Sequence, residues 1–437
     1  MSNAGMLHLE KLTLRNFRCF EACDVYLDRH LTVLIAENVN DLNQQIVRDP
    51  YTFEVEIPFP DREERESFTL HYIDQYPETR EKLEMSPELL ALNTAGLNCV
   101  QLRTLLAEIR TGEALFTYTD LKERKKDIIE SEAGGLLEFV ETKFSLEDVA
   151  GHKAAKTHLK AAARALKAGR SDVMPMGYLV NGPVGTGKTF LVSCFATDIG
   201  IPMVQLKNFR SQWQGVTESN LERVLKLLRA MSPVAVMIDE ADAYLGNRSQ
   251  QGDSGVSNRV FSMIASFMSN TDHRGRIIWF LITARPDYMP VDLKRQGRAE
   301  EHIALFYPDN NDEKRELFEV MLRKTKIKDV KVTDFDDAFF DGLTILSGAD
   351  MEAALTRAKF KAAALDLPAI TTELVAEVFD DFLPPTYPEE VELMNYVAVL
   401  ECTSKELLPE RFRVLSRAEV IQRIEELKMI IRVGRAG

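Results

Sequence analysis

The sequence lacks the features of a membrane or secreted protein. It has no run of 18 apolar residues and no signal-peptide pattern, which argues against a membrane-spanning helix. Cysteine is scarce as well: there are five among 437 residues, and only Cys19 and Cys23 lie close together. Because no second pair stands at zinc-ligand spacing, the pattern argues against a metal site and favours reduced thiols. We therefore expect a soluble, cytoplasmic protein.

Positive charge is also in short supply. Lysine and arginine number 54 against 68 aspartates and glutamates, which gives a net charge of −14. A protein that coats nucleic acid has the opposite balance, so we do not expect a nucleic-acid partner, although a local basic channel is left open. What is present is an ordinary globular composition, 45% hydrophobic and 28% charged, in a chain long enough for about three domains.

An internal repeat is the clearest sign of organisation. Residues 33–68 and 280–318 each run through an apolar strand, a polar turn, an Asp-Leu pair, a second apolar stretch, a Pro-Asp and a charged helix start. A small-residue turn follows later in both copies, at Thr94–Leu97 and Ser347–Asp350. The first copy has too few residues upstream for a phosphate loop. It is therefore predicted to be the remnant of a nucleotide-binding module that no longer binds nucleotide.

The start of the chain has a second resemblance. Residues 7–38 resemble the opening hairpin of RecF/OLD-type ATPases, in which a glycine-rich phosphate loop comes next. Here Val39, Asn40 and Asp41 follow, without a Gly-Lys-Ser sequence. On this interpretation too, the segment is predicted not to bind nucleotide.

A complete phosphate loop occurs further along the chain. The apolar strand Tyr178–Asn181 leads into Gly182–Thr189, which reads Gly-Pro-Val-Gly-Thr-Gly-Lys-Thr, and a helical segment follows. This is the G-x-x-x-x-G-K-[ST] pattern in its strand–loop–helix context, where backbone N–H groups and the helix N-terminus hold phosphate. We expect Lys188 to contact the β- and γ-phosphates of ATP and Thr189 to ligate Mg²⁺. The other residues predicted around the phosphates are Pro183, Val184, Gly185, Thr186, Gly187 and Phe190.

Two carboxylates complete this pattern. The apolar strand Val234–Ile238 ends in Asp239 and Glu240, and the carboxyl ends of parallel strands are where α/β sheets bind ligands. We expect Asp239 to hold the Mg²⁺ shell and Glu240 to polarise the attacking water.

Patterns along the chain divide it into five parts. Apolar strands alternate with amphipathic helices over residues 175–307, which predicts an α/β fold with a parallel sheet. The predicted parts are the degenerate module 1–118, a charged linker 119–144, the ATPase core 145–309, a helical lid 310–385 and a helical tail 386–437.

Residues 145–385 resemble the ATPase module of the AAA (AAA+) family. The resemblance begins at Ser145–Gly151 and extends through Leu293–Arg298 and Ser347–Asp350. It implies a P-loop NTPase fold, a homo-hexameric ring, and arginine fingers at Arg295 and Arg298 that act on the neighbouring subunit's ATP. It also implies that nucleotide contacts come from Val149, Ala150, Gly151, Gly348 and Ala349.

The chain departs from the family at one position. The family has an asparagine at the end of the strand Ile277–Thr283, where it orients water, and here Ala284 occupies that position. We expect Thr283 to substitute for the asparagine, or else hydrolysis to be slow.

Trp213 is the candidate contact to a protein substrate. One of only two tryptophans in the chain, it lies in a polar loop whose position resembles the pore loop of AAA rings. A half-buried surface tryptophan is the alternative. The polar residues 248–255 are either a second pore loop or a plain surface loop. Gly151–His158 lacks the glutamate and the spacing of a zinc-protease helix, H-E-x-x-H.

Two hypotheses for function follow. The first is a ring ATPase that remodels or unfolds a protein client. The second is an assembly or scaffold ATPase that switches with nucleotide and has little threading activity. Substrate-stimulated hydrolysis that depends on Trp213 favours the first, and nucleotide-dependent assembly with negligible turnover favours the second. A nucleic-acid motor is a weaker third hypothesis, and the sequence does not identify a client.

Overall fold

The computed structural model describes residues 11–17, 20–26, 43–50, 52–55, 57–207, 217–245, 254–343, 347–383 and 387–434. These residues belong to two compact units, Met1–Ile57 and Pro58–Gly437. None of the described helices is both long enough and apolar enough to cross a membrane.

The first unit contains a hairpin and one short helix. Strands β1 (Lys11–Phe17) and β2 (Phe20–Tyr26) pair antiparallel, with Lys11 opposite Tyr26, and α1 spans Gln44–Val47. The hairpin agrees with the resemblance noted for residues 7–38. The apolar strand that opens the first repeat copy lies outside the described residues.

A helical domain opens the second unit. All of its helices except α3 begin at side-chain caps: Asp61, Ser86, Asn98 and Thr117 each accept a hydrogen bond from the first turn of the helix that follows. The helices are α2 (Arg62–Gln75), α3 (Glu78–Glu81), α4 (Pro87–Asn93), α5 (Cys99–Thr111) and α6 (Tyr118–Glu132).

The segment predicted as a linker, 119–144, is part of the folded structure. Most of it is helix α6, in which Leu121 and Ile129 are buried, and it continues into β3 (Leu137–Phe139) at the edge of the sheet. Gly134 and Gly135, both at positive φ, separate the two elements. The linker prediction was wrong because Leu121 and Ile129, with the partly buried Ile128, suffice to pack a helix whose charged residues are exposed or half-buried.

The sheet of the second unit has six strands in the order β3-β5-β6-β7-β4-β8. All adjacent pairs are parallel except β3 with β5, so the predicted α/β fold with a parallel sheet is confirmed. The remaining strands are β4 (Gly177–Asn181), β5 (Met203–Leu206), β6 (Val234–Ile238), β7 (Ile277–Thr283) and β8 (Glu301–Ala304).

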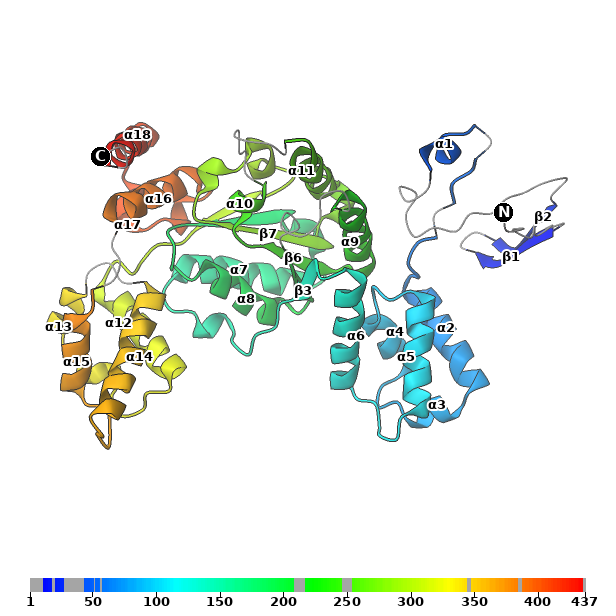
Figure 1. Ribbon diagram of the computed structural model, residues 1–437, viewed down its shortest axis with the longest axis horizontal. Helices are drawn as coiled ribbons and strands as arrows, with labels where there is room; N and C mark the ends of the chain where they lie inside the picture. The colour runs from blue at the N-terminus through cyan, green and yellow to red at the C-terminus, as the bar shows by residue number, and fades with distance from the viewer. Residues whose placement is uncertain are drawn as a thin grey trace, which may run out of the picture. The chain divides into compact units, whose positions relative to one another are not determined.

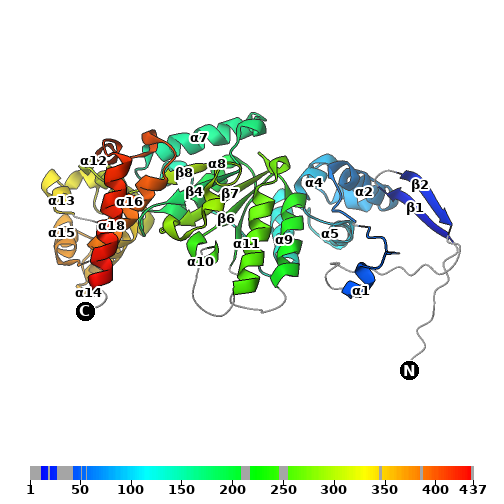
Figure 2. The same ribbon diagram turned by 90° about the horizontal axis from the view of Figure 1, so that it is seen from above.

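Helices cover both faces of this sheet (Figures 1 and 2). On one face, α7 (Lys153–Lys167) and α8 (Lys188–Ile199) pack over an apolar cluster that includes Leu159, Phe195 and Phe280. On the other face lie α9 (Thr217–Met231), α10 (Ala241–Leu245) and α11 (Ser254–Met268). The apolar core of the helical domain is continuous with the cluster on this second face.

The lid consists of α12 (Asn311–Thr325), α13 (Asp337–Gly342), α14 (Gly348–Ala364) and α15 (Thr372–Asp381). It has its own aromatic core, in which Phe318 packs edge-on against Phe335, Phe340 and Phe379.

The tail contains α16 (Pro388–Glu401), α17 (Glu410–Arg413) and α18 (Arg417–Gly434). Its apolar residues enclose Ala304 and Phe306, at the end of β8. Thr403 and His302 also form two hydrogen bonds: His302 N–H donates to the threonine hydroxyl at 3.0 Å, and Thr403 N–H donates to the His302 carbonyl at 3.4 Å. The tail is therefore packed against the edge strand of the core.

The described residues of the second unit also form seven short 3₁₀ turns. They are η2 (Leu146–Asp148), η3 (Ser171–Val173), η4 (Thr271–His273), η5 (Pro286–Tyr288), η6 (Val291–Lys294), η7 (Val332–Asp334) and η8 (Lys405–Leu407).

Candidate functional site

The loop between β4 and α8 depends on glycine. Gly182, Gly185 and Gly187 all have positive φ, which glycine adopts without the steric penalty of a side chain. A Cβ on Gly182 would lie 2.0 Å from the carbonyl oxygen of Leu305, so the loop also packs directly against the end of β8. This geometry leaves backbone N–H groups free to turn toward an anion at the start of α8.

Lys188 is held at the base of this loop. Its ammonium group donates to the carbonyl oxygens of Gly182 at 2.9 Å and Pro183 at 2.7 Å. Burial lowers the pKa of Lys188 to about 8, against the opposing influence of Asp239 and Asp242. A phosphate group here would offer this ammonium a stronger acceptor than two carbonyls.

Thr189 and Asp239 form the second part of the site. The Thr189 hydroxyl donates to Oδ2 of Asp239 at 2.8 Å, and Oδ1 of the same carboxylate accepts from Glu240 N–H at 2.8 Å. Glu240 has a φ of 49°, which is uncommon for a residue other than glycine. A hydroxyl and a carboxylate side by side suit Mg²⁺, which takes one or two protein oxygens and fills its shell with water and phosphate.

Thr283 points its hydroxyl toward a carboxylate that the sequence analysis gave no role. The hydroxyl donates to Oδ1 of Asp242 at 2.6 Å and accepts from Arg285 N–H at 2.9 Å. Ala284 lines the same cavity as Thr283, Glu240 and Asp242. A methyl group therefore shares this cavity with the two carboxylates, Glu240 and Asp242.

Two cavities meet at the phosphate loop. The one on the phosphate side has a volume of about 880 Å³ and the one on the other side about 480 Å³, both within the usual range for small-molecule sites. Predicted residues that line the first are Val184, Gly185, Gly187, Lys188, Thr189, Phe190, Asp239, Glu240, Thr283, Gly348 and Ala349. Predicted residues that line the second include Val149, Ala150, Gly151 and Thr186. Pro183 lines neither cavity and contributes its carbonyl to Lys188 and Thr186.

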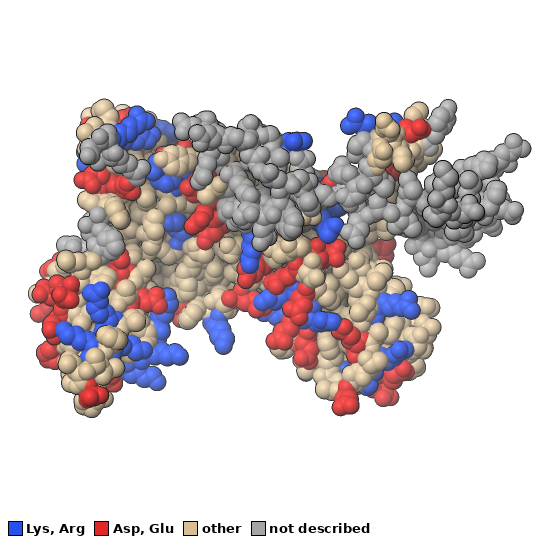
Figure 3. Space-filling model, viewed as in Figure 1, with Lys and Arg blue, Asp and Glu red and all other residues tan. Residues whose placement is uncertain are grey.

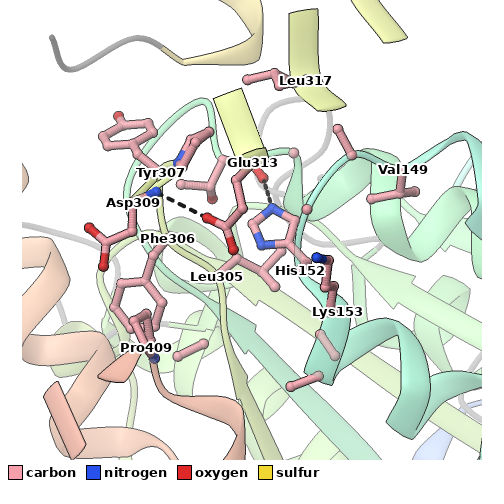
Figure 4. A pocket seen from close by; sticks show the side chains of 18 of the residues that line it. Val149, His152, Lys153, Leu305, Phe306, Tyr307, Asp309, Glu313, Leu317 and Pro409 are labelled. Atoms are coloured by element: carbon pink, nitrogen blue, oxygen red, sulfur yellow. Dashed lines mark hydrogen bonds between the residues drawn. The ribbon is translucent and has the colours of Figure 1, made fainter. Parts of the chain in front are cut away.

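The second cavity contains a histidine that the sequence analysis did not assign to the site (Figure 4). His152 has a φ of 49°, and its Nε2 lies 3.0 Å from the Thr186 carbonyl oxygen. Burial lowers the pKa of His152 to about 4, so the ring is neutral at pH 7 and its Nε2–H donates to that carbonyl. Its only sequence signal is its place directly after Gly151.

The lid reaches the phosphate loop at one point. A Cβ on Gly185 would lie 2.6 Å from Cβ of Ser347, the N-cap of α14. Lys156 of α7 joins the core to the lid. Its ammonium donates to the Val149 carbonyl at 2.6 Å and to Glu316 of α12 at 3.1 Å. Both contacts place the start of α14 and one side of α12 next to the cavities.

The two arginines predicted as fingers, Arg295 and Arg298, are not part of the wall of either cavity. The Arg295 side chain is 59% exposed, whereas that of Arg298 is 11% exposed and donates to the Asp292 carbonyl at 2.8 Å. Trp213 and residues 248–253 of the second loop lie outside the described residues.

Comparison with protein families finds two matches. Residues 178–307, from β4 to just beyond β8, match the family model "ATPase family associated with various cellular activities (AAA)". This part of the chain is an AAA domain. A second family model, "AAA+ chaperone, second helical domain", matches residues 63–134, which hold helices α2 to α6.

The chain also resembles curated proteins over part of its length. The cell division cycle protein 48 homolog of Archaeoglobus fulgidus is 31% identical over 187 residues, which is 42% of this chain and 25% of the relative. The uncharacterized AAA domain-containing protein ycf46 of Trieres chinensis is 26% identical over 285 residues, 63% of this chain and 56% of the relative. The ATP-dependent zinc metalloprotease FtsH of Pelobacter propionicus is 28% identical over 251 residues, 55% of this chain and 39% of the relative. The chain thus spans between 25% and 56% of these curated relatives.

Proposed function

We propose that the protein is a Mg²⁺-dependent ATPase that assembles into a homo-hexameric ring and remodels a protein client. One observation carries the ATPase proposal: Lys188, Thr189, Asp239 and Glu240 line a single cavity at the phosphate loop, with the Thr189 hydroxyl 2.8 Å from the Asp239 carboxylate. Lys188 balances phosphate charge, Thr189 and Asp239 hold Mg²⁺, and Glu240 polarises the water that attacks the γ-phosphorus. When bound between Thr189 and Asp239, Mg²⁺ would neutralise charge that develops on the transferred phosphoryl group.

The arginine fingers belong to the same proposal. Arg295, with most of its side chain exposed, would reach the ATP of the neighbouring subunit, where a guanidinium stabilises the transition-state charge. Arg298 would act as a finger only after leaving the Asp292 carbonyl. Thr283 would take the place of the family's asparagine, with Asp242 holding its hydroxyl.

A protein is the partner that the observations favour. The second family model belongs to AAA+ chaperones, and one relative is by name an ATP-dependent protease. On the face seen in Figure 3, the described lysines and arginines are interspersed with acidic side chains over the lid and the helical domain. In this proposal Trp213 contacts the client, because an aromatic side chain offers a large, rigid surface to varied polypeptide.

A nucleotide-switched assembly or scaffold ATPase is the second candidate. Ala284 favours it, because a methyl group lines the cavity at the position where an amide would orient water. In that case ATP would bind and set the oligomeric state while turnover stayed very slow.

Three variants test the ATPase proposal and separate the two candidates. Lys188→Ala should lose ATP binding in a calorimetric titration. Glu240→Gln should bind ATP and hydrolyse it at least about a hundredfold more slowly than wild type. Near-wild-type turnover in Glu240→Gln would sink the assignment. Trp213→Ala should keep basal hydrolysis but lose stimulation by an unfolded model protein if the ring acts on clients. Stimulation that survives this change would remove the pore role.

A further inference from the structure

The second cavity has a side that comes from the far end of the chain. Glu406, Leu407, Leu408, Pro409, Glu410 and Arg413 line it, together with Val149, His152 and Tyr307. We call Glu406–Arg413 the tail segment. Figure 4 shows Pro409 beside Phe306, across the cavity from Val149. The tail segment lies outside residues 178–307 and was not predicted to contact nucleotide.

The tail segment is fixed in place by its own contacts. Arg413 folds back and donates from Nε to the Leu408 carbonyl at 2.7 Å and from Nη2 to the Glu406 carbonyl at 3.0 Å. Leu407 packs on the cluster beneath α7 and α8, and Phe412 lies 5.1 Å, centroid to centroid, from Phe306. These contacts hold Leu408 and Pro409 in one position beside the cavity.

The same segment is tied to the connection between core and lid. Nη1 of Arg411 lies 2.9 Å from Oδ1 of Asp309, whose N–H donates to Glu313 of α12 at 3.0 Å. Tyr307, two residues before Asp309, donates its hydroxyl to the carbonyl of Val184 in the phosphate loop. The tail segment thus contacts the stretch of chain through which β8 leads into the lid.

The apolar and acidic residues of this wall suit a nucleobase better than a phosphate, and Arg413, the cation of the tail segment that lines the cavity, is engaged by the Leu408 and Glu406 carbonyls. Leu408, Pro409 and Phe306 supply apolar surface for a planar ring, while Glu406, Glu410 and Glu313 supply carboxylates near it. Carboxylates accept hydrogen bonds from an amino group and repel phosphate. The groups that suit phosphate, Lys188 and Thr189, line the cavity on the other side of the loop.

We propose that the tail segment is the outer wall of the base pocket and sets the affinity of the protein for the adenine part of ATP. This inference rests on the proposed ATPase function and deepens it: residues more than 200 positions after the phosphate loop complete the nucleotide site. The tail segment acts on the base and leaves the phosphate contacts unchanged.

The experiment compares Mg²⁺-ATP with Mg²⁺-tripolyphosphate, which carries the phosphates without the base. Full-length Pro409→Trp places an indole where the wall meets the base, and Arg413→Gln removes the two hydrogen bonds that hold the segment. Val414→Ala is the matched control, because this neighbouring side chain is 79% exposed and does not line the cavity. Calorimetry gives both dissociation constants, and a thermal melt confirms that each variant is folded.

In both variants we expect the dissociation constant for ATP to rise about tenfold or more, with that for tripolyphosphate unchanged. The control should behave as wild type. Equal changes for the two ligands, no change for either, or a wild type that binds ATP no more tightly than tripolyphosphate would overturn the inference. A wild type that binds neither ligand would instead overturn the ATPase function itself, and the inference with it. If Pro409→Trp does not fold, Arg413→Gln decides alone, since its side chain is at the surface.

Discussion

Ala284 is the residue at which this protein differs most from what its family resemblance implies. Its methyl group lines the phosphate-side cavity beside Glu240 and Thr283. Thr283 carries a neutral hydrogen-bonding group in the same cavity, and its hydroxyl is already engaged by Asp242 at 2.6 Å. A hydroxyl that donates to a carboxylate can still accept from water, but it reaches less far than an amide.

Introducing an amide at position 284 should therefore speed ATP hydrolysis. Ala284→Asn is expected to raise kcat about tenfold, because a further aligned polar group would orient the attacking water in the transition state. A phosphate-release assay at saturating ATP measures this. Ala243→Asn, which adds an amide to the same cavity from α10, is the control and should give no gain. An unchanged kcat in a folded, ATP-binding Ala284→Asn protein would show that Thr283 already does the work.

His152 makes stability depend on pH in a defined window. Burial lowers its pKa to about 4 in the folded protein, from 6.5 for the free side chain. As pH falls below 6.5 the unfolded chain takes up the proton first, so stability is full above pH 6.5 and is lost progressively toward pH 4. The loss from this residue is at most about 3 kcal/mol.

The variant that tests this is His152→Asn, because asparagine tolerates the left-handed backbone at φ 49°. Urea unfolding at pH 7 and pH 4.5 should show a smaller drop in the free energy of unfolding for His152→Asn than for wild type. Parallel pH dependence in the two proteins would mean that the buried ring does not titrate in this window.

At this scale the sequence was informative wherever the chemistry is local. The phosphate loop, Asp239 and Glu240 could be predicted because a local pattern marks each of them, a glycine-rich loop or a carboxylate pair at a strand end, even though Asp239 and its partner Thr189 are 50 positions apart. Asp242 and His152 have no such local pattern, and their partners Thr283 and Thr186 stand 41 and 34 positions away. Only the folded sheet brings such groups together.

At the scale of elements, the contact between the phosphate loop and α14 distinguishes two glycines of the loop whose backbone conformations are similar. Gly185 and Gly187 have φ of 80° and 81°, but a Cβ on Gly185 would lie 2.6 Å from Ser347 Cβ, while nothing lies within 4 Å of one on Gly187. Alanine at either position strains the backbone by about 1 kcal/mol. Only Gly185→Ala also pushes against the lid.

Gly185→Ala should therefore lower the melting temperature more than Gly187→Ala does. The double variant Gly185→Ala/Ser347→Gly should recover most of that difference, because glycine removes the opposing Cβ and is a tolerable N-cap. Differential scanning calorimetry of the four proteins gives the comparison. Equal melting temperatures for the two single variants would mean that the lid yields to the added methyl group.

Element types were more predictable than their partners. The alternation of strands and helices predicted the parallel sheet, and the apolar spacing predicted a helical tail. Neither pattern could show that α16 packs on β8 or that the tail segment reaches the cavity beside His152, because the first contact joins residues about a hundred positions apart and the second joins residues more than 250 positions apart. The charged α6 was mistaken for a linker because its two buried residues leave a weak apolar stripe.

For the whole molecule, the proposed ring makes a prediction about mixtures of inactive subunits. Lys188→Ala protein keeps its arginines, and Arg295→Ala protein keeps its phosphate loop. If each ATP lies between two subunits, mixing them should regenerate some complete sites and restore part of the ATPase activity. Lys188→Ala mixed with Glu240→Gln is the control and should stay inactive, since both changes affect the same side of the site. No rescue between proteins shown to co-assemble would argue against a shared site.

The two hydrogen bonds between Thr403 and His302 have a consequence for solubility. β8 is the last strand of its sheet, and an outermost strand offers unpaired N–H and C=O groups to any other extended chain. Thr403 occupies both groups of His302, while α16, α17 and α18 cover the apolar side chains of Ala304 and Phe306. A protein truncated so that it lacks residues 386–437 would expose the open edge of β8 next to the apolar side chains of Ala304 and Phe306. It should therefore self-associate through strand pairing, and its sedimentation would report aggregates before any defect in nucleotide binding could be measured.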